Sequence, residues 1–145
     1  MSWCPPNYSL QDATAWYERS AQAWTAEGDR EFGIFDASSG EVLGCVGINQ
    51  INHVNLYGNM GYWVRTSCEK RGIASTAARL AASFAFANLG LVRIEIVVLP
   101  DNLPSRRVAE KIGARFECIA RSRLQFKGET RDAAVYSLVR DDALG

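Results

Sequence analysis

The sequence predicts one mixed α/β domain, with a mostly antiparallel sheet flanked by helices. Three observations predict this class. Apolar residues recur at helical spacing in three segments, short β-branched or alternating runs separate them, and Gly, Asn and Asp mark the joins. A chain of 145 residues with 48% hydrophobic content can bury the core of one domain, residues 1–145. The expected order is α-β-β-β-α-β-α-β-β, with a right-handed crossover in the central strand–helix–strand unit.

The first helix is expected to begin after Ser9, because a serine hydroxyl can cap the first N–H groups of a helix. Asp12 places an acid in the first turn, where the helix dipole favours it, and Gly28 is expected to end the helix. Trp16 and Trp24 lie on the apolar stripe. We interpret both as packing residues rather than as a binding feature.

Three strands should follow, at 31–35, 42–48 and 54–64. The first two form a hairpin, and the third pairs with the second after a polar connection at 49–53. Gly44 and Gly47 interrupt the second strand, which indicates a bulge or a close backbone contact.

The second half begins with a long helix after Gly72. Its expected inward stripe is Ile73, Ala77, Leu80, Ala81 and Phe84. A buried strand at 92–99, a loop at 100–104 and a short helix at 105–112 follow, and 116–126 and 132–139 should form a closing hairpin.

Composition excludes several classes of function. Sixteen basic and sixteen acidic side chains give zero net charge, which argues against general binding to nucleic acid or to an anionic membrane. No apolar run approaches the ~20 residues of a membrane helix, and no signal peptide is visible, so we expect a cytoplasmic protein. Four scattered cysteines are expected to be reduced: Cys4, Cys45, Cys68 and Cys118. The chain has a single histidine, His53, which argues against a zinc site and against a Cys–His nucleophile. No metal is expected.

The passage from an apolar strand through Gly72 into a helix predicts an anion site. The first N–H groups of a helix lack intrahelical partners and lie at the positive end of its dipole. Glycine lets the backbone approach phosphate oxygens closely. An ordinary left-handed turn before a helix explains the same residues, and neither a P-loop nor a dinucleotide fingerprint is present. The candidate donors are the backbone N–H groups of Lys70, Arg71, Gly72, Ile73, Ala74 and Ser75.

Four motifs carry a family resemblance. Segment 69–74, Glu-Lys-Arg-Gly-Ile-Ala, resembles the R/Q-x-x-G-x-G/A acyl-CoA motif of the GNAT N-acetyltransferase superfamily. Segment 102–114 resembles the second motif of that family, N-x-x-S-x-x-x-x-E-K-x-G-F. Gly-Tyr-Trp-Val at 61–64 and the closing strand at 131–138 resemble the RimJ/RimL-like branch, which acetylates the N-termini of ribosomal proteins.

The chain departs from the family pattern in three places. Glu69 stands where the family usually has Gln or Arg, and Ala114 replaces the aromatic residue of the second motif. The usual first strand and first helix have no counterpart, which would leave strand 31–35 as an exposed edge. Exposed edges are usually covered or paired, which favours a homodimer.

The resemblance implies direct transfer of acetyl from acetyl-CoA to an amine. The strand of Trp63 and Val64 is expected to splay from its neighbour at a bulge, so that pantetheine lies against it and the Val64 N–H holds the acetyl carbonyl. Asn102 and Arg107 are further expected contacts of coenzyme A. Ser105 is the candidate that protonates the leaving thiolate, although a helix-start hydrogen bond explains it equally well.

The sequence identifies the general base less clearly than it identifies the coenzyme A motifs. Many relatives carry a glutamate where this chain has Met60, and Glu95 on the next strand is the expected replacement. A solvent-facing carboxylate beside Arg93 is the other interpretation of Glu95. Neutralising an α-amine at pH 7 costs roughly 1 kcal/mol, against over ~4 kcal/mol for lysine. The acceptor is therefore expected to be a protein N-terminus.

Two alternatives remain open. In the first, which is a close variant of the same reaction, the acceptor is a small amine such as an aminoglycoside or a polyamine. In a different class of function, the chain binds coenzyme A without turnover, as a sensor or partner module. Met60 and the missing first elements favour this second alternative.

Overall fold

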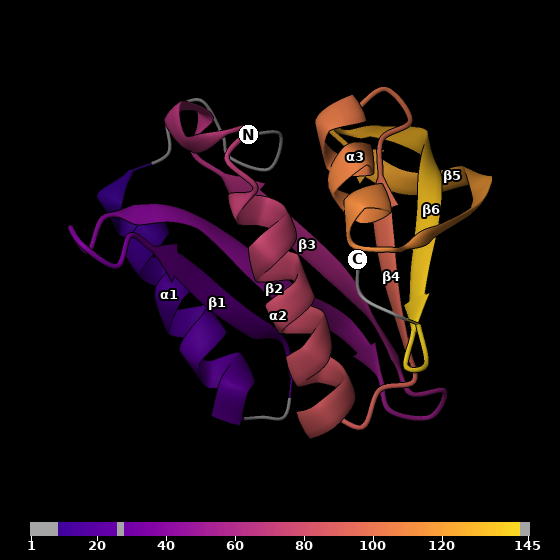
Figure 1. Cartoon of the computed structure of the whole chain (residues 1–145), viewed down its shortest axis with the longest axis horizontal. Coiled ribbons are helices and arrows are strands. Elements are labelled where there is room, and N and C mark those ends of the chain that lie inside the picture. The colour runs from indigo at the N-terminus through magenta and orange to yellow at the C-terminus, as the bar shows by residue number, and fades with distance from the viewer. Residues whose placement is uncertain (1–8, 26–27, 143–145) are drawn as a thin grey trace.

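The structure is a computed structural model that describes residues 9–25 and 28–142. Its elements follow the predicted order (Figure 1). They are α1 (Leu10–Thr25), β1 (Arg30–Phe35), β2 (Val42–Asn52), β3 (Tyr57–Val64), the 3-10 turn η1 (Thr66–Cys68), α2 (Ile73–Asn88), β4 (Arg93–Val98), α3 (Leu103–Lys111), β5 (Arg115–Phe126) and β6 (Glu129–Val139). No helix in this described part is both long and apolar enough to cross a membrane.

The strands form one sheet in the order β1-β2-β3-β4-β6-β5. Among the described strands only β3 and β4 pair in parallel, and the other neighbours are antiparallel. This confirms the mixed, mostly antiparallel sheet. The parallel pair is joined through α2, because parallel neighbours need a crossover connection rather than a tight turn.

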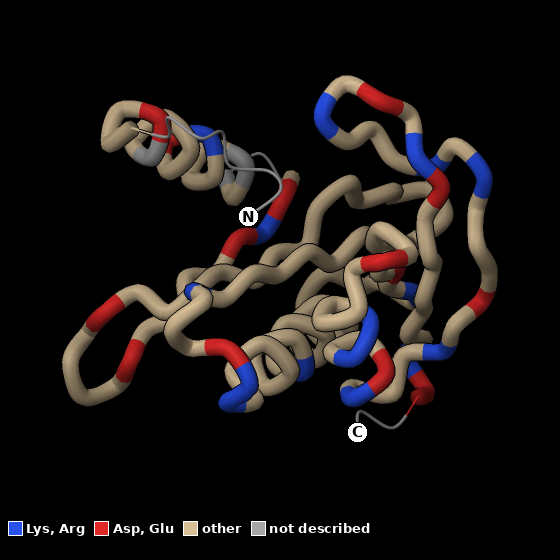
Figure 2. The backbone as a smooth tube through the Cα atoms, turned by 90° about the horizontal axis from the view of Figure 1, so that it is seen from above, with Lys and Arg blue, Asp and Glu red and all other residues tan. Residues whose placement is uncertain are grey.

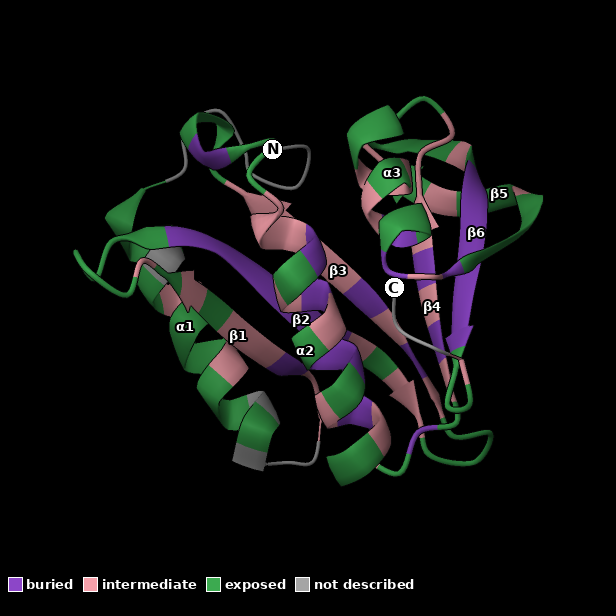
Figure 3. Cartoon of the chain, in the orientation of Figure 1, coloured by how far each residue is buried: buried purple, intermediate pink, exposed green. Residues whose placement is uncertain are grey.

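Helices α1 and α2 lie on opposite sides of the sheet, as the two perpendicular views show (Figures 1 and 2). Figure 3 shows where α2 is buried. The buried residues of α2 all have small side chains, and the helix packs on β2 and β3. The predicted inward stripe is wrong in part, because Leu80 is 69% exposed. Alanines at the interface leave the larger side chains at its flank. The buried residues are Ser75, Ala78, Ala81, Ala82 and Ala85.

The cap of α1 is confirmed. Ser9 Oγ accepts a hydrogen bond from the Asp12 N–H at 3.1 Å, and Asp12 Oδ2 accepts one from the Ser9 N–H at 2.8 Å. This reciprocal pair satisfies two donors at the helix start. Trp24 packs against Phe32, with ring centroids 5.3 Å apart, as the packing interpretation predicted. The helix ends at Thr25, and residues 26–27, before the predicted stop at Gly28, lie outside the described residues.

Several predicted boundaries are wrong, among them the start of β6, which begins at Glu129 rather than at 132. Strand β2 continues through the predicted connection at 49–53 as far as Asn52, and β3 begins at Tyr57 rather than at 54. A register shift between Asn49 and Asn52, with Gln50 at φ 50°, lets β2 carry an extra residue and stay paired. Asn52 Oδ1 then accepts the N–H groups of the following turn at 3.0 and 2.7 Å.

Helix α3 begins at Leu103, inside the predicted loop. Asn102 caps it by accepting the Ser105 N–H at 3.3 Å, and a proline is tolerated in the first turn. Arg106 Nε donates to the hydroxyl of the fully buried Tyr136 at 2.9 Å, and that hydroxyl donates to Glu110 at 2.9 Å. The charged side chains of the second motif therefore anchor α3 to β6.

Candidate active site

Strands β3 and β4 pair over three residues and then separate. The paired positions are Tyr57 with Arg93, Gly58 with Ile94 and Asn59 with Glu95. Beyond Asn59 the rest of β3 continues to pair with β2, and the rest of β4 continues to pair with β6. The predicted splay is therefore present. The bulge that accompanies it lies in β2, between Asn49 and Asn52, rather than in β3.

A cavity of about 600 Å³ lies at this splay. Its walls come from β1, β2, β3, β4, the start of α3, the β5–β6 hairpin and Trp16 of α1. Both polar and apolar groups line it, which suits a ligand with a polar end and an apolar stem. The lining residues used below are Glu31, Cys45, Asn49, Asn59, Gly61, Tyr62, Trp63, Asn102, Ser105 and Lys127.

The N-terminus of α2 lies at the same end of the sheet, because β3 leads through η1 directly into the helix (Figure 1). Gly72 is the N-cap, at φ 75°, and no side chain of residues 9–25 or 28–142 caps the helix. The first N–H groups therefore have neither an intrahelical nor a side-chain acceptor there. Ser75 Oγ donates to the Gly72 carbonyl at 3.0 Å, which holds the turn in shape.

A lysine from α3 adds positive charge beside this turn. A Cβ at Gly72 would lie 3.7 Å from Lys111 Nζ. The Lys111 carbonyl also accepts a hydrogen bond from Arg79 Nη2 of α2, at 3.2 Å. Lys111 lies within the second motif, but its proximity to Gly72 depends on how α2 and α3 pack, which the local sequence does not specify.

The start of α3 faces the cavity through Asn102 and Ser105. Tyr62 of β3 donates a hydrogen bond from its hydroxyl to the Ser105 carbonyl at 2.6 Å, which ties α3 to β3 across the splay. Burial raises the pKa of Tyr62, so the phenol stays protonated and keeps this bond. Asn102, rather than Ser105, supplies the capping side chain, because Asn102 Oδ1 accepts the Ser105 N–H, and Ser105 lines the cavity.

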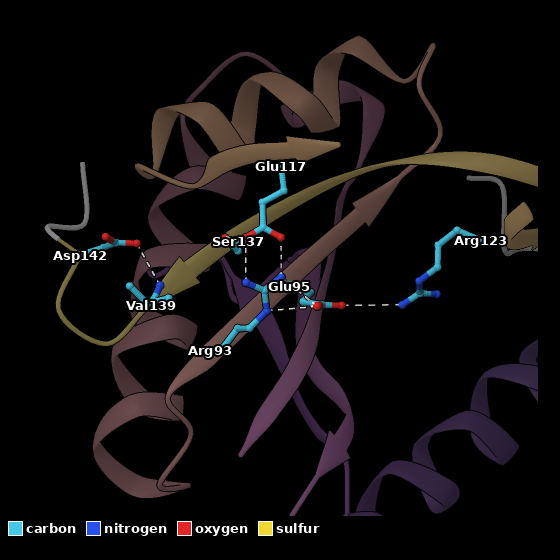
Figure 4. A network of polar contacts seen from close by, with 7 residues as sticks. All are labelled: Arg93, Glu95, Glu117, Arg123, Ser137, Val139 and Asp142. Carbon is cyan, nitrogen blue, oxygen red and sulfur yellow. Dashed lines mark hydrogen bonds and ion pairs between the residues drawn. The ribbon is translucent and has the colours of Figure 1, made fainter. Parts of the chain in front are cut away.

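Glu95 is held by arginines. Its Oε1 accepts from Arg93 Nε at 3.1 Å and from Nη2 at 3.0 Å, and Arg123 Nη2 lies 3.8 Å from its Oε2 (Figure 4). Arg93 also binds Glu117 through two hydrogen bonds of 2.8 and 2.7 Å. These hydrogen bonds from Arg93, and one from Ser137, lower the pKa of Glu117 to about 2.

Glu31 has different surroundings. It lies on β1 and lines the cavity, and the Cys45 thiol donates to its Oε2 at 3.4 Å. Burial raises the pKa of Glu31, and the nearby Asp29 raises it further. Burial likewise raises the pKa of Cys45 to about 12, with the Glu31 charge adding to the effect, so the thiol stays protonated. None of the ion pairs among the described residues includes Glu31.

The predicted site residues fall into three groups. Trp63, Asn102 and Ser105 line the cavity, whereas residues 70–75 form the turn and helix start that follow β3 and η1 and do not line it. Val64 ends β3 next to Trp63, outside the cavity wall. The exposed Arg107 and the paired Glu95 also lie outside that wall.

Sequence reasoning missed Glu31 and Asn59. Both are polar residues on strands, and their meeting in one cavity depends on the register of β1, β2 and β3. No group of three His, Cys, Asp or Glu side chains in the described residues is placed to hold a metal ion.

Comparison with known proteins identifies relatives of this chain. The model of the acetyltransferase (GNAT) domain matches residues 1–115. YjcK of Bacillus subtilis, named a probable N-acetyltransferase, is 39% identical over 112 residues, which are 77% of this chain and 62% of YjcK. The chain therefore spans about three fifths of the length of that curated relative.

Solved structures share the fold, among them the following two. A candidate ribosomal-protein-serine acetyltransferase from Vibrio cholerae superposes with a TM-score of 0.83 at 30% identity, covering 91% of this chain and 76% of that one. RimJ of Mycobacterium smegmatis, solved in complex with CoA-disulfide, gives a TM-score of 0.85 at 26% identity, covering 92% of this chain and 64% of that one.

Proposed function

Because the chain belongs to the acetyltransferase (GNAT) domain family, we propose that it transfers an acetyl group from acetyl-CoA to a primary amine, the α-amine of a protein N-terminus. The observation that carries this proposal is the splay of β3 from β4, with the uncapped N-terminus of α2 at its open end. The splay frees backbone groups on two strands, and the helix start offers N–H donors to an anion.

The described residues fit the two ends of coenzyme A. The αL conformation of Gly72, with Lys111 beside it, suits a diphosphate, since a side chain at Gly72 would strain the turn. Residues 70–75 would hold the diphosphate, and Arg107 is exposed on the adjoining helix for a further phosphate. Trp63 and Asn102 in the cavity wall would contact the pantetheine arm.

Bound acetyl-CoA supplies an activated acyl group as a thioester. The chain supplies the positioning groups. The backbone N–H of Val64 at the end of β3 would hold the acetyl oxygen, and the Ser105 hydroxyl would pass a proton to the departing sulfur. Donors of this kind contribute about 3 kcal/mol in related acyl transfers.

A protein N-terminus is favoured as acceptor by chemistry and by similarity. An α-amine has a pKa near 8, so little driving force is needed to neutralise it. Both solved relatives described above carry names from the ribosomal-protein branch. Peptides beginning with serine or alanine are therefore the first acceptors to test.

The test measures release of CoA thiol from acetyl-CoA in the presence of such peptides. We expect release with the free peptide and none with the same peptide already N-acetylated. Spermidine and a lysine side-chain peptide give the comparison with other amines. Calorimetric binding of CoA without release on any acceptor would contradict the proposal and support the sensor alternative.

Two further expectations accompany this function. Cys45, Cys68 and Cys118 carry free thiols, which suits the reducing cytoplasm where we place the protein. Strand β1 lies at an edge of the described sheet, so a second copy pairing there would give the expected homodimer. Sedimentation of the purified chain measures the oligomeric state, and a monomer would contradict the second expectation.

A further inference from the structure

The position of Glu31 on the sheet is set by two glycines. Glu31 pairs with Gly47 on β2, and Gly47 pairs with Gly61 on β3, so the three residues form one row across three strands. A Cβ at Gly47 would overlap the Glu31 carboxylate. The carboxylate therefore lies over Gly47, inside the space that a side chain there would fill, and Gly61 leaves the next position in the row open.

Asn59 contributes another hydrogen-bond acceptor to the same cavity. Asn59 Oδ1 is buried and has no hydrogen-bond partner in the part of the chain that the structure describes, while its Nδ2 donates to Asn49 Oδ1 at 2.9 Å. A buried acceptor without a donor is costly, unless a ligand provides the donor. Glu31 and Asn59 both line the cavity, so its polar groups favour a ligand rich in N–H donors, as an amine is.

The titratable neighbours of Glu31 leave its carboxylate available to accept a proton. Among the described residues, Cys45 of β2 and Asp29 before β1 are the titratable groups that act on the pKa of Glu31, and neither is a cation. Helix α1 contributes Trp16 to this cavity, and the β5–β6 hairpin contributes Lys127. Glu95 contrasts with this, because Arg93 and Arg123 already engage its oxygens.

We infer that Glu31 takes the proton of the acceptor amine, and that Gly47 and Gly61 form the floor along which the amine reaches the splay. The inference rests on the proposed acetyl transfer and names a catalytic carboxylate for it. Glu31 removes one proton from the ammonium, which frees the nitrogen lone pair. The nitrogen then bonds to the acetyl carbon and the carbon–sulfur bond breaks. The sulfur takes the hydroxyl proton of Ser105, which Ser105 regains from water. The amide nitrogen gives its surplus proton to water, and Glu31 then returns its own proton to water.

The test compares Glu31→Gln with the wild type and with Glu41→Gln, a matched change at an exposed turn. We expect kcat/KM for the peptide to fall about 10²-fold or more in Glu31→Gln, within the usual range for a general base. The KM for acetyl-CoA should stay within about twofold, since Glu31 lies away from the α2 N-terminus. Glu41→Gln should match the wild type.

The pH profile separates catalysis from a structural role. In the wild type, kcat/KM should rise with pH along two limbs. The first limb reports loss of the proton from Glu31, and the second reports loss of the proton from the acceptor amine. That first limb should be missing in Glu31→Gln, so that only the amine pKa remains. An unchanged profile and rate in Glu31→Gln would overturn the inference while leaving the acetyltransferase proposal intact.

A binding measurement covers the case in which no acceptor turns over. The free peptide and its N-acetylated form are titrated into the CoA-saturated chain, wild type and Glu31→Gln. Selective binding of the free amine, weakened at least fivefold by Glu31→Gln, would support the amine site even though the proposed function had failed. Equal binding of both peptides, or by both proteins, would overturn it.

Discussion

Two carboxylate clusters in this chain have opposite environments. Around Arg93, at the closed end of the β3–β4 pair, Glu95 and Glu117 are both bound to a guanidinium (Figure 4). On the cavity wall, Glu31 has only a thiol donor among its described side-chain partners. Arg93 lowers the pKa of Glu117, whereas burial raises the pKa of Glu31. A carboxylate that is already paired stabilises the fold, and one that lacks a cation remains free to accept a proton.

The strongest way to break this comparison is to fill the space under Glu31. In Gly47→Ala the new Cβ occupies the place of the Glu31 carboxylate, which is the mobile end of a side chain and can move aside. The fold should survive, while kcat/KM for the acceptor should fall about 10- to 100-fold as the base is displaced.

Gly33→Ala is the matched control for that change. The three atoms nearest to its Cβ would belong to the ring of Phe35, which is 61% exposed and can turn away. We expect wild-type kinetics from Gly33→Ala. Full activity in Gly47→Ala as well would contradict a catalytic role for the carboxylate above it.

Removing the cation from the other cluster should affect stability instead. Arg93→Met leaves Glu95 and Glu117 repelling each other without their shared donor. We expect the free energy of unfolding in urea to fall by about 2 kcal/mol at pH 7, discounted for the partial exposure of the side chains. The exposed Arg121→Met should change it by less than ~0.5 kcal/mol. Equal effects of the two substitutions would show that the cluster contributes no net stability.

A change from Glu to Gln should affect stability in opposite directions in the two clusters. Glu117 has a folded-state pKa of about 2 against an ordinary value of 4.5, so its stabilisation is present above pH 4.5 and is lost as the pH falls towards 2. Glu117→Gln should therefore cost about 1 kcal/mol at pH 7 and almost nothing near pH 2.

At Glu31 the pH dependence of stability has the opposite sign. Its raised pKa means that protonation favours the folded state, and this contribution is lost as the pH rises through the folded pKa. Glu31→Gln should be as stable as the wild type at pH 7, or slightly more stable. Urea unfolding of both variants from pH 3 to pH 8 measures the two trends, and a large loss of stability in Glu31→Gln at pH 7 would make it a structural residue.

The smallest expected effect concerns a third carboxylate. Glu69 is exposed just before the turn at Gly72, where an acid repels a bound diphosphate through solvent. Glu69→Gln should tighten CoA binding about two- to fivefold in calorimetry at low salt, with less gain at high salt. No change at either salt concentration would mean that the Glu69 charge does not act on the diphosphate.

Local signals made much of the fold predictable. The reciprocal bonds of Ser9 and Asp12, the αL turn at Gly72 and the order of the elements all depend on residues close in sequence. The inward face of α2 was harder to predict. The sheet selects alanines there and leaves Leu80 outside, which depends on helix–sheet distance rather than on helical periodicity.

The candidate site was predictable where motifs carried it and unpredictable where register did. Asn102 and Ser105 were found because their motif is contiguous, and both line the cavity. Glu31 was missed because its row with Gly47 and Gly61 joins three strands whose alignment the sequence does not specify. Its local signal was a single acid directly before the run Phe32–Phe35 of β1.

A crystal structure of the chain with acetyl-CoA bound is the most direct measurement of where the thioester lies. We predict diphosphate oxygens within hydrogen-bond distance of the N–H groups at 71–75, and the acetyl carbon between β3 and β4, on the side that faces Glu31 across Gly61. A ligand seated elsewhere, with the α2 N-terminus and the splay both unused, would contradict this placement.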